Sequence, residues 1–396
     1  MDFDDVVIGS GMAALGAVLG LAPGRRVLVL TGPVQGQYAY YDSRNTVPCA
    51  YLGEGGLGND WHGVIPTGLQ ENFGTTSEAD FSSLFAHFYP HSDIRPRLGQ
   101  AWIFVPWRAI RPKMELTRLA QQRAGRLVLR PELAQAFRVN DSGVQVSSAS
   151  GQVRTRRVWV AAGALHTPGL LERSLNQRLS RGLVSDHVLC YIGQVAGRQA
   201  PQIFRTRDGM FISAEYGPNN CGLYTRRPAR FKFRQLDHGI EQRAVFGLPT
   251  GNAIKKIMRR MSPGLLAEAF YNRFGLFPQA PLYSVYAQVH TKDAYVLGDG
   301  RTPLKAQTQA IRVATDHARQ AQPFDQLLHS QRPEIFIPGI HLHHSLDLPA
   351  LTEAGVNTVD SSVQVIDASV LSEIGPDHHT FQMLLAARMK AQQLGN

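Results

Sequence analysis

The fold is decided near the start of the chain, where residues 6–14 read Val6-Val7-Ile8-Gly9-Ser10-Gly11-Met12-Ala13-Ala14. The apolar triplet predicts a buried strand, the Gly-Ser-Gly segment a turn, and the small and apolar residues that follow a helix. Gly9 permits the tight turn, Gly11 leaves room for a diphosphate beside the backbone, and Ala14 lets the helix pack closely on the strand. The helix N-terminus then offers free N–H donors to the phosphates. This order predicts a dinucleotide site, with candidate contacts at Gly9, Gly11, Met12, Ala13 and Ala14.

A second strand is predicted at residues 26–30 and is followed by Thr31. In dinucleotide sites of this kind an acidic residue usually follows the second strand and binds the ribose hydroxyl groups. Thr31 occupies that place, and its hydroxyl group can make one weaker hydrogen bond. We therefore take Thr31 as a candidate contact, and the departure argues against ordinary NAD binding.

The overall composition is that of a globular protein. The chain has 396 residues, of which 43% are hydrophobic and 18% are charged, enough for one large or two intergrown domains. Its formal net charge of +10 is spread along the sequence, so we favour solvated arginines over an anionic partner and expect no nucleic-acid binding. Three scattered cysteines, the lack of a secretory signal and the lack of a long apolar run lead us to expect a cytoplasmic protein.

Four later segments narrow the choice of dinucleotide. Residues 55–63 read GGLGNDWHG, residues 158–171 VWVAAGALHTPGLL, residues 184–187 VSDH and residues 365–371 VIDASVL. Together with the first turn, and in this order, they resemble the glucose–methanol–choline oxidoreductase family, flavoenzymes that oxidise alcohols. The region from about 195 to 330 matches the family only in outline, and this is where such enzymes differ by substrate.

The resemblance implies FAD as the cofactor and assigns three further groups of residues to it. Glycine and alanine suit places where a flat ligand meets the backbone, and an acid at the end of a strand can bind a ribityl hydroxyl group. The implied contacts are Gly55, Gly56 and Asn59 along the flavin, Ala162 and Gly163 at the adenosine half, and Asp367 and Ala368 near the ribityl chain and the ring.

Covalent attachment of the flavin is a separate question. Some members of the resembled family attach it through a histidine in the glycine-rich loop. In this chain Asp60 occupies the nearest matching place, and His62 lies two residues further on. We therefore expect FAD to be bound without a covalent link.

Oxidation of an alcohol requires a base, and histidine suits this role because its ordinary pKa of about 6.5 lies near the working pH. Five of the 14 histidines fall in the last 56 residues. In the resembled family the base precedes the VIDASV strand, and its partner, a histidine or asparagine, follows it. We take His343 or His344 as the base and His378 or His379 as the partner, although the residues after them depart from the family pattern. Structural histidines or a metal site are the alternatives, and we assign no metal.

We expect an α/β fold, with a Rossmann-like FAD-binding domain and an interwoven, reduced substrate domain built on an antiparallel sheet. The stretch 253–277 has a basic first half and an apolar second half. It could dock on a membrane or an acyl carrier, but we favour a helix of the substrate domain. The expected divisions are residues 1–35, 111–190 and 331–396 for the FAD-binding domain, and residues 36–110 and 191–330 for the flavin-covering insertion and substrate domain.

The leading functional hypothesis is an FAD-dependent alcohol dehydrogenase or oxidase that acts on a small organic substrate. Hydride would pass to flavin N5, a C-terminal histidine would take the proton, and oxygen or another acceptor would take the electrons. Two alternatives stay open: a biosynthetic flavoenzyme with other two-electron chemistry, such as desaturation, and a flavin-binding subunit without catalysis.

Overall fold

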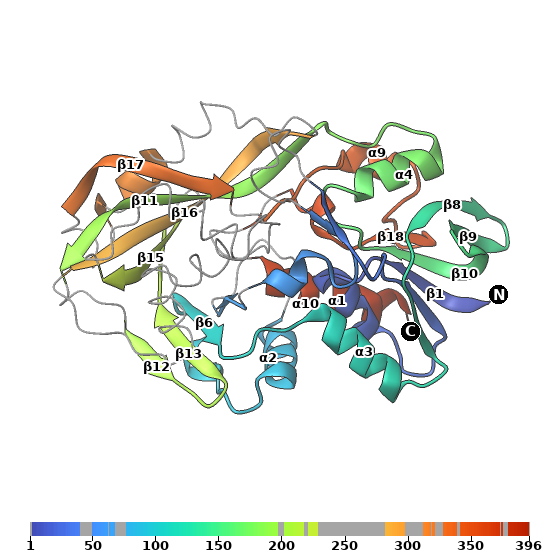
Figure 1. The fold of residues 1–396 in the computed structure, drawn as a ribbon, viewed down its shortest axis with the longest axis horizontal. Coiled ribbons are helices and arrows are strands. Elements are labelled where there is room, and N and C mark those ends of the chain that lie inside the picture. Colours follow the sequence, from blue (N-terminus) through green and yellow to red (C-terminus); the bar gives the residue numbers. More distant parts are fainter. Residues whose placement is uncertain are drawn as a thin grey trace, which may run out of the picture.

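The computed structural model describes residues 2–39, 50–61, 63–67, 77–196, 202–217, 221–228, 282–297, 312–317, 319–320, 328–338, 341–372, 374 and 379–395. Helices and a mainly parallel sheet form one side of the molecule, and a long antiparallel sheet forms the other (Figure 1). The predicted helix at 253–277, the covalent candidate His62 and the partner candidate His378 lie outside the described residues.

A seven-stranded sheet combines strands from the N-terminal and the C-terminal parts of the chain. Four parallel pairings, β7 with β2, β2 with β1, β1 with β10, and β10 with β18, form its central part. The antiparallel strands β9 and β8 complete the order β7-β2-β1-β10-β9-β8. Apolar runs such as VLVL in β2 are typical of strands that are covered on both faces. The strands are β1 (Phe3–Ile8), β2 (Val27–Leu30), β7 (Leu127–Arg130), β8 (Ala134–Asn140), β9 (Gly143–Ser148), β10 (Gly151–Val160) and β18 (Val363–Val365).

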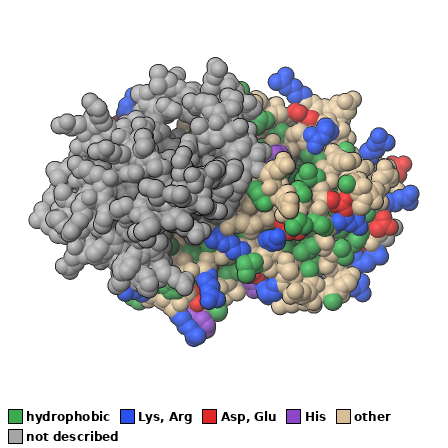
Figure 2. All heavy atoms as spheres, in the orientation of Figure 1, with side chains coloured by type: hydrophobic (Ala, Val, Ile, Leu, Met, Phe, Trp, Pro, Cys, Tyr) green, Lys and Arg blue, Asp and Glu red, His purple; other side chains and the backbone are tan. Residues whose placement is uncertain are grey.

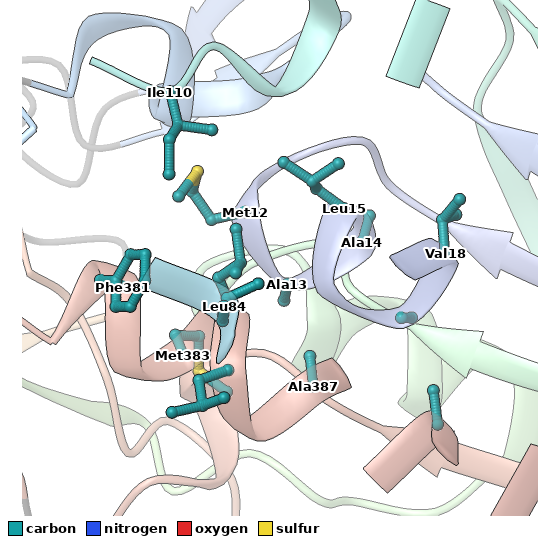
Figure 3. Packing of buried hydrophobic residues seen from close by; sticks show 14 of the residues in the cluster. Met12, Ala13, Ala14, Leu15, Val18, Leu84, Ile110, Phe381, Met383 and Ala387 are labelled. Carbon is teal, nitrogen blue, oxygen red and sulfur yellow. The ribbon is translucent and has the colours of Figure 1, made fainter. Parts of the chain in front are cut away.

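The helices cover this sheet. The first helix lies beside the last one, so that both ends of the chain contribute to one apolar cluster (Figures 1 and 3). Short loops lead from strands into α1 and α4, as in a doubly wound fold. The α-helices in the described ranges, apart from residues 312–320, are α1 (Met12–Gly20), α2 (Glu78–Phe88), α3 (Pro112–Gln122), α4 (Thr167–Leu175), α9 (Leu348–Glu353) and α10 (Thr380–Gly395).

The contact between α1 and α10 depends on two glycines. A Cβ atom added at Gly16 would collide with the carbonyl oxygen of Leu384, and one added at Gly20 would collide with that of Arg388. The opposing side chains at these levels are Ala387 and Ala391. Small residues on both helices therefore allow an approach that larger side chains would prevent.

We predict that Gly16→Leu lowers the free energy of unfolding by about 1–3 kcal/mol or more, because α10 must move to admit the side chain. Gly24→Leu is the matched control, since a Cβ at Gly24 meets nothing within 4 Å. Urea denaturation of both variants measures the difference. Equal stabilities would contradict the close helix contact.

The second layer is a five-stranded antiparallel sheet of order β14-β15-β16-β11-β17. A four-stranded sheet of order β12-β13-β6-β5 lies next to α2 (Figure 1), and β3 pairs with β4. The strands are β3 (Gln37–Ala39), β4 (Ala50–Leu52), β5 (Ile65–Pro66), β6 (Trp102–Pro106), β11 (Leu183–Ala196), β12 (Ile203–Arg205), β13 (Gly209–Ser213), β14 (Glu215–Gly217), β15 (Cys221–Pro228), β16 (Leu282–Val296) and β17 (Leu328–Pro338).

Two elements differ from what the sequence pattern predicts. The sequence pattern predicts two separate strands at 153–156 and 158–162, whereas the structure has one continuous strand, β10, over Gly151–Val160, because its first half pairs with β9 and its second half with β18. The weakly periodic region 36–110 contains a regular helix, α2, which begins at the N-cap Ser77 and buries Phe81, Leu84 and Phe85. The division into domains stays a prediction.

The distribution of charged side chains on the surface can be compared with the positive net charge of the chain. Lys and Arg side chains on the described part of the visible face are scattered among acidic and neutral ones (Figure 2). No helix in the ranges that the structure describes is long and apolar enough to cross a membrane.

Candidate active site

The predicted cofactor residues come together at one edge of the seven-stranded sheet. The parallel strands β1, β2, β10 and β18 all end at this edge. The backbone ladder continues past the strand ends, with Gly9 N–H donating to Leu30 O at 2.9 Å and Ala161 N–H donating to Ile8 O at 2.8 Å. The carboxyl edge of a parallel sheet is where ligands bind in such folds.

The first turn has the geometry that its sequence predicts. Gly9 has a φ of +110°, and a Cβ there would collide with the carbonyl oxygen of Ala161. A Cβ at Gly11 would instead meet only Gly55 O, at 3.9 Å, so that space beside this backbone is open. Met12, Ala13 and Ala14 are buried in the apolar cluster around α1 and α10 (Figure 3). Of the five candidates, Gly11 is thus the one that adjoins open space.

The glycine-rich loop is fastened to this turn by Ser10. Its hydroxyl group donates to Thr31 O at 2.7 Å and accepts from Gly55 N–H at 2.8 Å. The Thr31 hydroxyl group is 3.1 Å from Gly32 O and 3.2 Å from Arg130 O, and the residue is buried. One serine therefore joins the turn, the end of β2 and the loop, and the sequence motif assigned it no role.

The loop itself is held by its own asparagine. Asn59 donates its side-chain amide to Glu54 O at 2.7 Å and folds against Gly55, where a Cβ would collide with it. Gly55 and Gly56 both have positive φ angles, of +85° and +52°. The side chain of Asn59 thus stabilises the conformation of the loop that carries the two glycines.

Asp367 organises the opposite side of the edge. Its Oδ2 accepts from Gly163 N–H at 2.8 Å and from the Thr167 hydroxyl group at 2.5 Å. Its Oδ1 accepts from the Ser369 N–H at 2.9 Å and from the Ser369 hydroxyl group at 2.5 Å. The carboxylate thereby joins the loop after β10, the start of α4 and the short 3-10 helix Ala368–Val370. Gly163, next to Ala162, has a φ of +86°, and a Cβ there would meet nothing within 4 Å.

Five histidine rings gather beside this edge. Ring centroids of neighbouring members are 4.9–6.4 Å apart. We call this group the histidine cluster. Its members are His187 of β11, His290 of β16, His341 and His343 of the segment 341–346, and His379 immediately before α10.

The segment 341–346 places the histidine cluster next to the predicted flavin contacts. On one side, His343 and Ser185 exchange two backbone hydrogen bonds of 3.0 Å. On the other side, His344 N–H donates to Ala368 O at 3.0 Å. The segment 341–346 therefore connects the histidine cluster to Ala368, which follows β18.

The hydrogen bonds of His343 define its tautomer. Nδ1 lies 2.9 Å from the carbonyl oxygen of His341, which can only accept, so Nδ1 carries the proton. Nε2 lies 2.8 Å from Nε2 of His290. Burial, with a smaller contribution from His290, lowers the pKa of His343 to about 3. His343 is therefore neutral near pH 7, its Nε2 accepts, and His290 donates its Nε2–H.

His344 does not join the histidine cluster. It has a φ of +54°, and its Nδ1 lies 3.1 Å from a guanidinium nitrogen of Arg181, which is only a donor. Arg181 is also 2.9 Å from the carboxylate of Asp293. Of the two predicted bases, the structure brings His343, and not His344, together with His379.

Three members of the histidine cluster were missing from the predicted site. His341 lies two residues before His343, His187 stands in the VSDH segment, and His290 lies at the end of an apolar pattern typical of a strand. The pairing of β11 with β16 sets His187 opposite His290 and brings both to the site. Within the described ranges, no group of three or more His, Cys, Asp or Glu side chains is arranged to hold a metal ion.

We predict that His343 makes the protein sensitive to acid. Its pKa is lower in the folded protein than the ordinary value of about 6.5, so unfolding takes up a proton between these values. As pH falls from about 6.5 towards 3, the free energy of unfolding should drop by up to about 1.4 kcal/mol per pH unit from this residue.

Denaturation at a series of pH values measures this slope. His343→Gln should lower the number of protons taken up on unfolding by about one. His91→Gln, at an exposed histidine, should leave that number unchanged. Equal slopes in the wild type and His343→Gln would show that burial does not suppress protonation of this ring.

One buried polar side chain near the start of α10 has no hydrogen-bond partner. Gln382, in the first turn of α10, is buried, and neither polar atom of its side chain has a hydrogen-bond partner. Its neighbours Phe381 and Met383 belong to the same apolar cluster as Met12. A buried amide without partners is costly, and a polar group of a ligand would satisfy it. The open space beside Gly11 and Gly163, together with this amide, is compatible with a bound dinucleotide such as FAD.

Comparisons with known proteins identify the fold. No protein-family model and no curated protein matches the chain. Among solved structures, it is similar to pyridoxine 4-oxidase from Mesorbium loti, with 12% identity, 99% of each chain covered and a TM-score of 0.50. A fungal aryl-alcohol oxidase matches at 13% identity over 99% of this chain and 98% of the other, with a TM-score of 0.49. Identities this low establish the fold alone. The chain has the α/β fold of glucose–methanol–choline oxidoreductases, which confirms the predicted fold class.

Proposed function

From this fold and this edge, we propose that the protein is an FAD-dependent oxidoreductase that oxidises the CH–OH group of a small organic molecule. The observation that carries the proposal is the position of His343. It precedes His344, whose N–H donates to Ala368 O next to the carboxyl edge of the sheet, and its own Nε2 is unprotonated. An imidazole in this state, next to a dinucleotide site, suits removal of a hydroxyl proton.

The residues that would hold FAD follow from the edge. The backbone of Gly9–Gly11 and the N-terminus of α1 would bind the diphosphate, and Gly55 and Gly56 would approach along its length. Gly163 would leave room for the adenosine half, and Asp367 would hold Gly163 and the Ala368 turn in place. The chemistry that bound FAD would supply is that of a hydride acceptor for the carbon that bears the hydroxyl group. His343 would take the hydroxyl proton at Nε2, and His379 would lie next to it.

The direct test is the absorption spectrum of the purified protein, followed by anaerobic addition of a panel of alcohols. We expect the spectrum of oxidised flavin, released by denaturation as free FAD, and bleaching by at least one alcohol. A colourless protein that takes up no FAD when it is added would refute the proposal. Reoxidation of the bleached protein by oxygen, or only by an added dye, then identifies an oxidase or a dehydrogenase.

The residues after His343 and His344 depart from the family pattern, and this departure motivates a second candidate, a flavoenzyme with other two-electron chemistry such as desaturation. A flavin-binding subunit without catalysis is the remaining possibility. Anaerobic reduction separates the three hypotheses. Bleaching of the flavin by an alcohol supports alcohol oxidation, and bleaching by other organic reductants but by no alcohol supports the other two-electron chemistry. Absence of bleaching by every compound supports a flavin-binding subunit without catalysis.

A further inference from the structure

The residue that follows His343 has a backbone conformation that is unusual for its side chain. His344 has a φ of +54°, in the left-handed region that glycine adopts readily and that other residues adopt at a cost. The other non-glycine residues with a positive φ, in the part of the chain that the structure describes, are asparagines and an aspartate. Their short polar side chains can form local hydrogen bonds in this conformation. The longer side chain of His344 needs support from another residue.

The conformation of His344 determines the course of the segment that carries His343. In a regular extended segment, successive backbone N–H groups point to opposite sides. The N–H of His343 donates to Ser185 O at 3.0 Å. On the other side, the N–H groups of both His344 and Ser345 donate to residues 368 and 369, at 3.0 and 3.1 Å. A left-handed residue allows such a change, as glycine does in a β-bulge. With an extended His344, these hydrogen bonds could not all form.

One arginine holds both the backbone and the ring of His344. Nη1 of Arg181 donates to His344 O at 3.0 Å. The same nitrogen lies 3.1 Å from His344 Nδ1, which accepts because a guanidinium group can only donate. The backbone N–H of Arg181 donates to Ser345 O at 3.0 Å. The carboxylate of Asp293, 2.9 Å from Nη1, offsets the positive charge. Arg181 therefore supports the left-handed residue and the residue that follows it.

We propose that Arg181 is a positioning residue, which keeps His343 directed into the site by holding His344 in its left-handed conformation. This inference rests on the proposed function, in which His343 takes the hydroxyl proton. Arg181 acts through the backbone, since the ring nitrogens of His343 have their partners in His341 and His290. Without Arg181, His344 would relax towards an extended conformation and turn the ring of His343 away from these partners. A catalytic group displaced by about 1 Å can cost about 100-fold in rate.

The test couples Arg181 to the conformation of residue 344. Arg181→Met removes the guanidinium group and keeps an unbranched side chain. We expect anaerobic flavin reduction by the alcohol to be at least about 10-fold slower in this variant, with normal flavin content. Adding His344→Gly should bring the rate back to within about threefold of the wild type, because glycine adopts a positive φ without support. Arg178→Met, at an exposed arginine three residues earlier, is the control.

Arg181→Lys separates the charge from the hydrogen bonds. Lysine can still pair with Asp293, but its compact ammonium group does not reproduce the planar fork of a guanidinium group. We expect its reduction rate to lie between those of the wild type and Arg181→Met. Thermal unfolding identifies any variant that fails to fold. If Arg181→Met is such a variant, Arg181→Lys with and without His344→Gly provides the same comparison.

Nitrogen NMR of the histidine-labelled holoenzyme gives a readout that does not depend on turnover. In the wild type, Nδ1 of His343 carries the proton and Nε2 does not, so their resonances should be well separated. We expect Arg181→Met to bring the two resonances closer together, because the displaced ring exchanges between tautomers. His344→Gly should restore their separation. A merely stabilising role of Arg181 would lower the unfolding temperature and leave these resonances unchanged, and that result would overturn the inference.

The failure of this inference differs from failure of the proposed function. If the wild-type protein lacks flavin, or no alcohol reduces it, the function itself is wrong and the inference is wrong with it. If alcohols reduce the wild type and Arg181→Met is within about threefold of it, only the role of Arg181 is overturned. A slow Arg181→Met that His344→Gly does not restore would also overturn it, because the loss would then not arise from the conformation of residue 344.

Discussion

Gly11→Asp is expected to yield a folded protein that retains no FAD. A Cβ at Gly11 meets only Gly55 O at 3.9 Å, so the fold accepts a side chain there. The same space adjoins the N-terminus of α1, where the diphosphate would bind. A carboxylate in it both fills the space and repels the phosphates. We expect the affinity for FAD to fall by at least about 100-fold, which corresponds to about 2.7 kcal/mol.

The comparison with Gly9 sharpens this prediction. Gly9 has a φ of +110° and no room for a Cβ beside Ala161 O, so Gly9→Asp should lose the fold itself. Gly24→Asp, at an exposed glycine with open space around it, should change neither property. Circular dichroism reports the fold, and titration of the flavin-free protein with FAD reports the affinity. Normal FAD binding by Gly11→Asp would place the cofactor elsewhere.

The N-terminal part of the fold was predictable because its signals are local. The apolar run of β1, the glycine turn and the small residues of α1 lie within 20 residues, and each confirms the others. The packing of α10 on α1 was not predictable from these signals. It depends on Gly16 and Gly20, which look like ordinary small helix residues until the last helix is placed against them. The helix α2 was missed because aromatic and glycine-rich sequence on both sides obscured its short amphipathic pattern.

The candidate site shows the same division between local and distant information. The glycine loop and Asp367 could be found from short motifs, but the four hydrogen bonds that occupy Asp367 involve residues up to 204 positions away. The sequence left His343 and His344 as equal candidates. Backbone conformation separates them, since the positive φ of His344 turns it to Arg181 while His343 faces the cluster. Sheet register, which no motif encodes, brings His290 to the site.

His343→Asn is expected to reduce the rate of flavin reduction by alcohol by about 100- to 10,000-fold while flavin content stays normal. The reason is that asparagine can accept a hydrogen bond from the substrate but cannot take its proton. His343 lies outside the diphosphate turn, so binding of FAD should not depend on it. The effect should appear in kcat rather than in KM, because the hydroxyl group can still be bound.

His344→Asn is the matched comparison, since it changes the adjacent histidine, whose ring interacts with Arg181 outside the cluster. We expect its reduction rate to stay within about threefold of the wild type. Stopped-flow reduction under anaerobic conditions measures both variants at saturating alcohol. If the two substitutions reduce the rate equally, the orientation of the segment 341–346 does not select the base. If only His344→Asn does so, the base is the residue that the fold turns towards Arg181, and the tautomer of His343 serves the structure rather than the reaction.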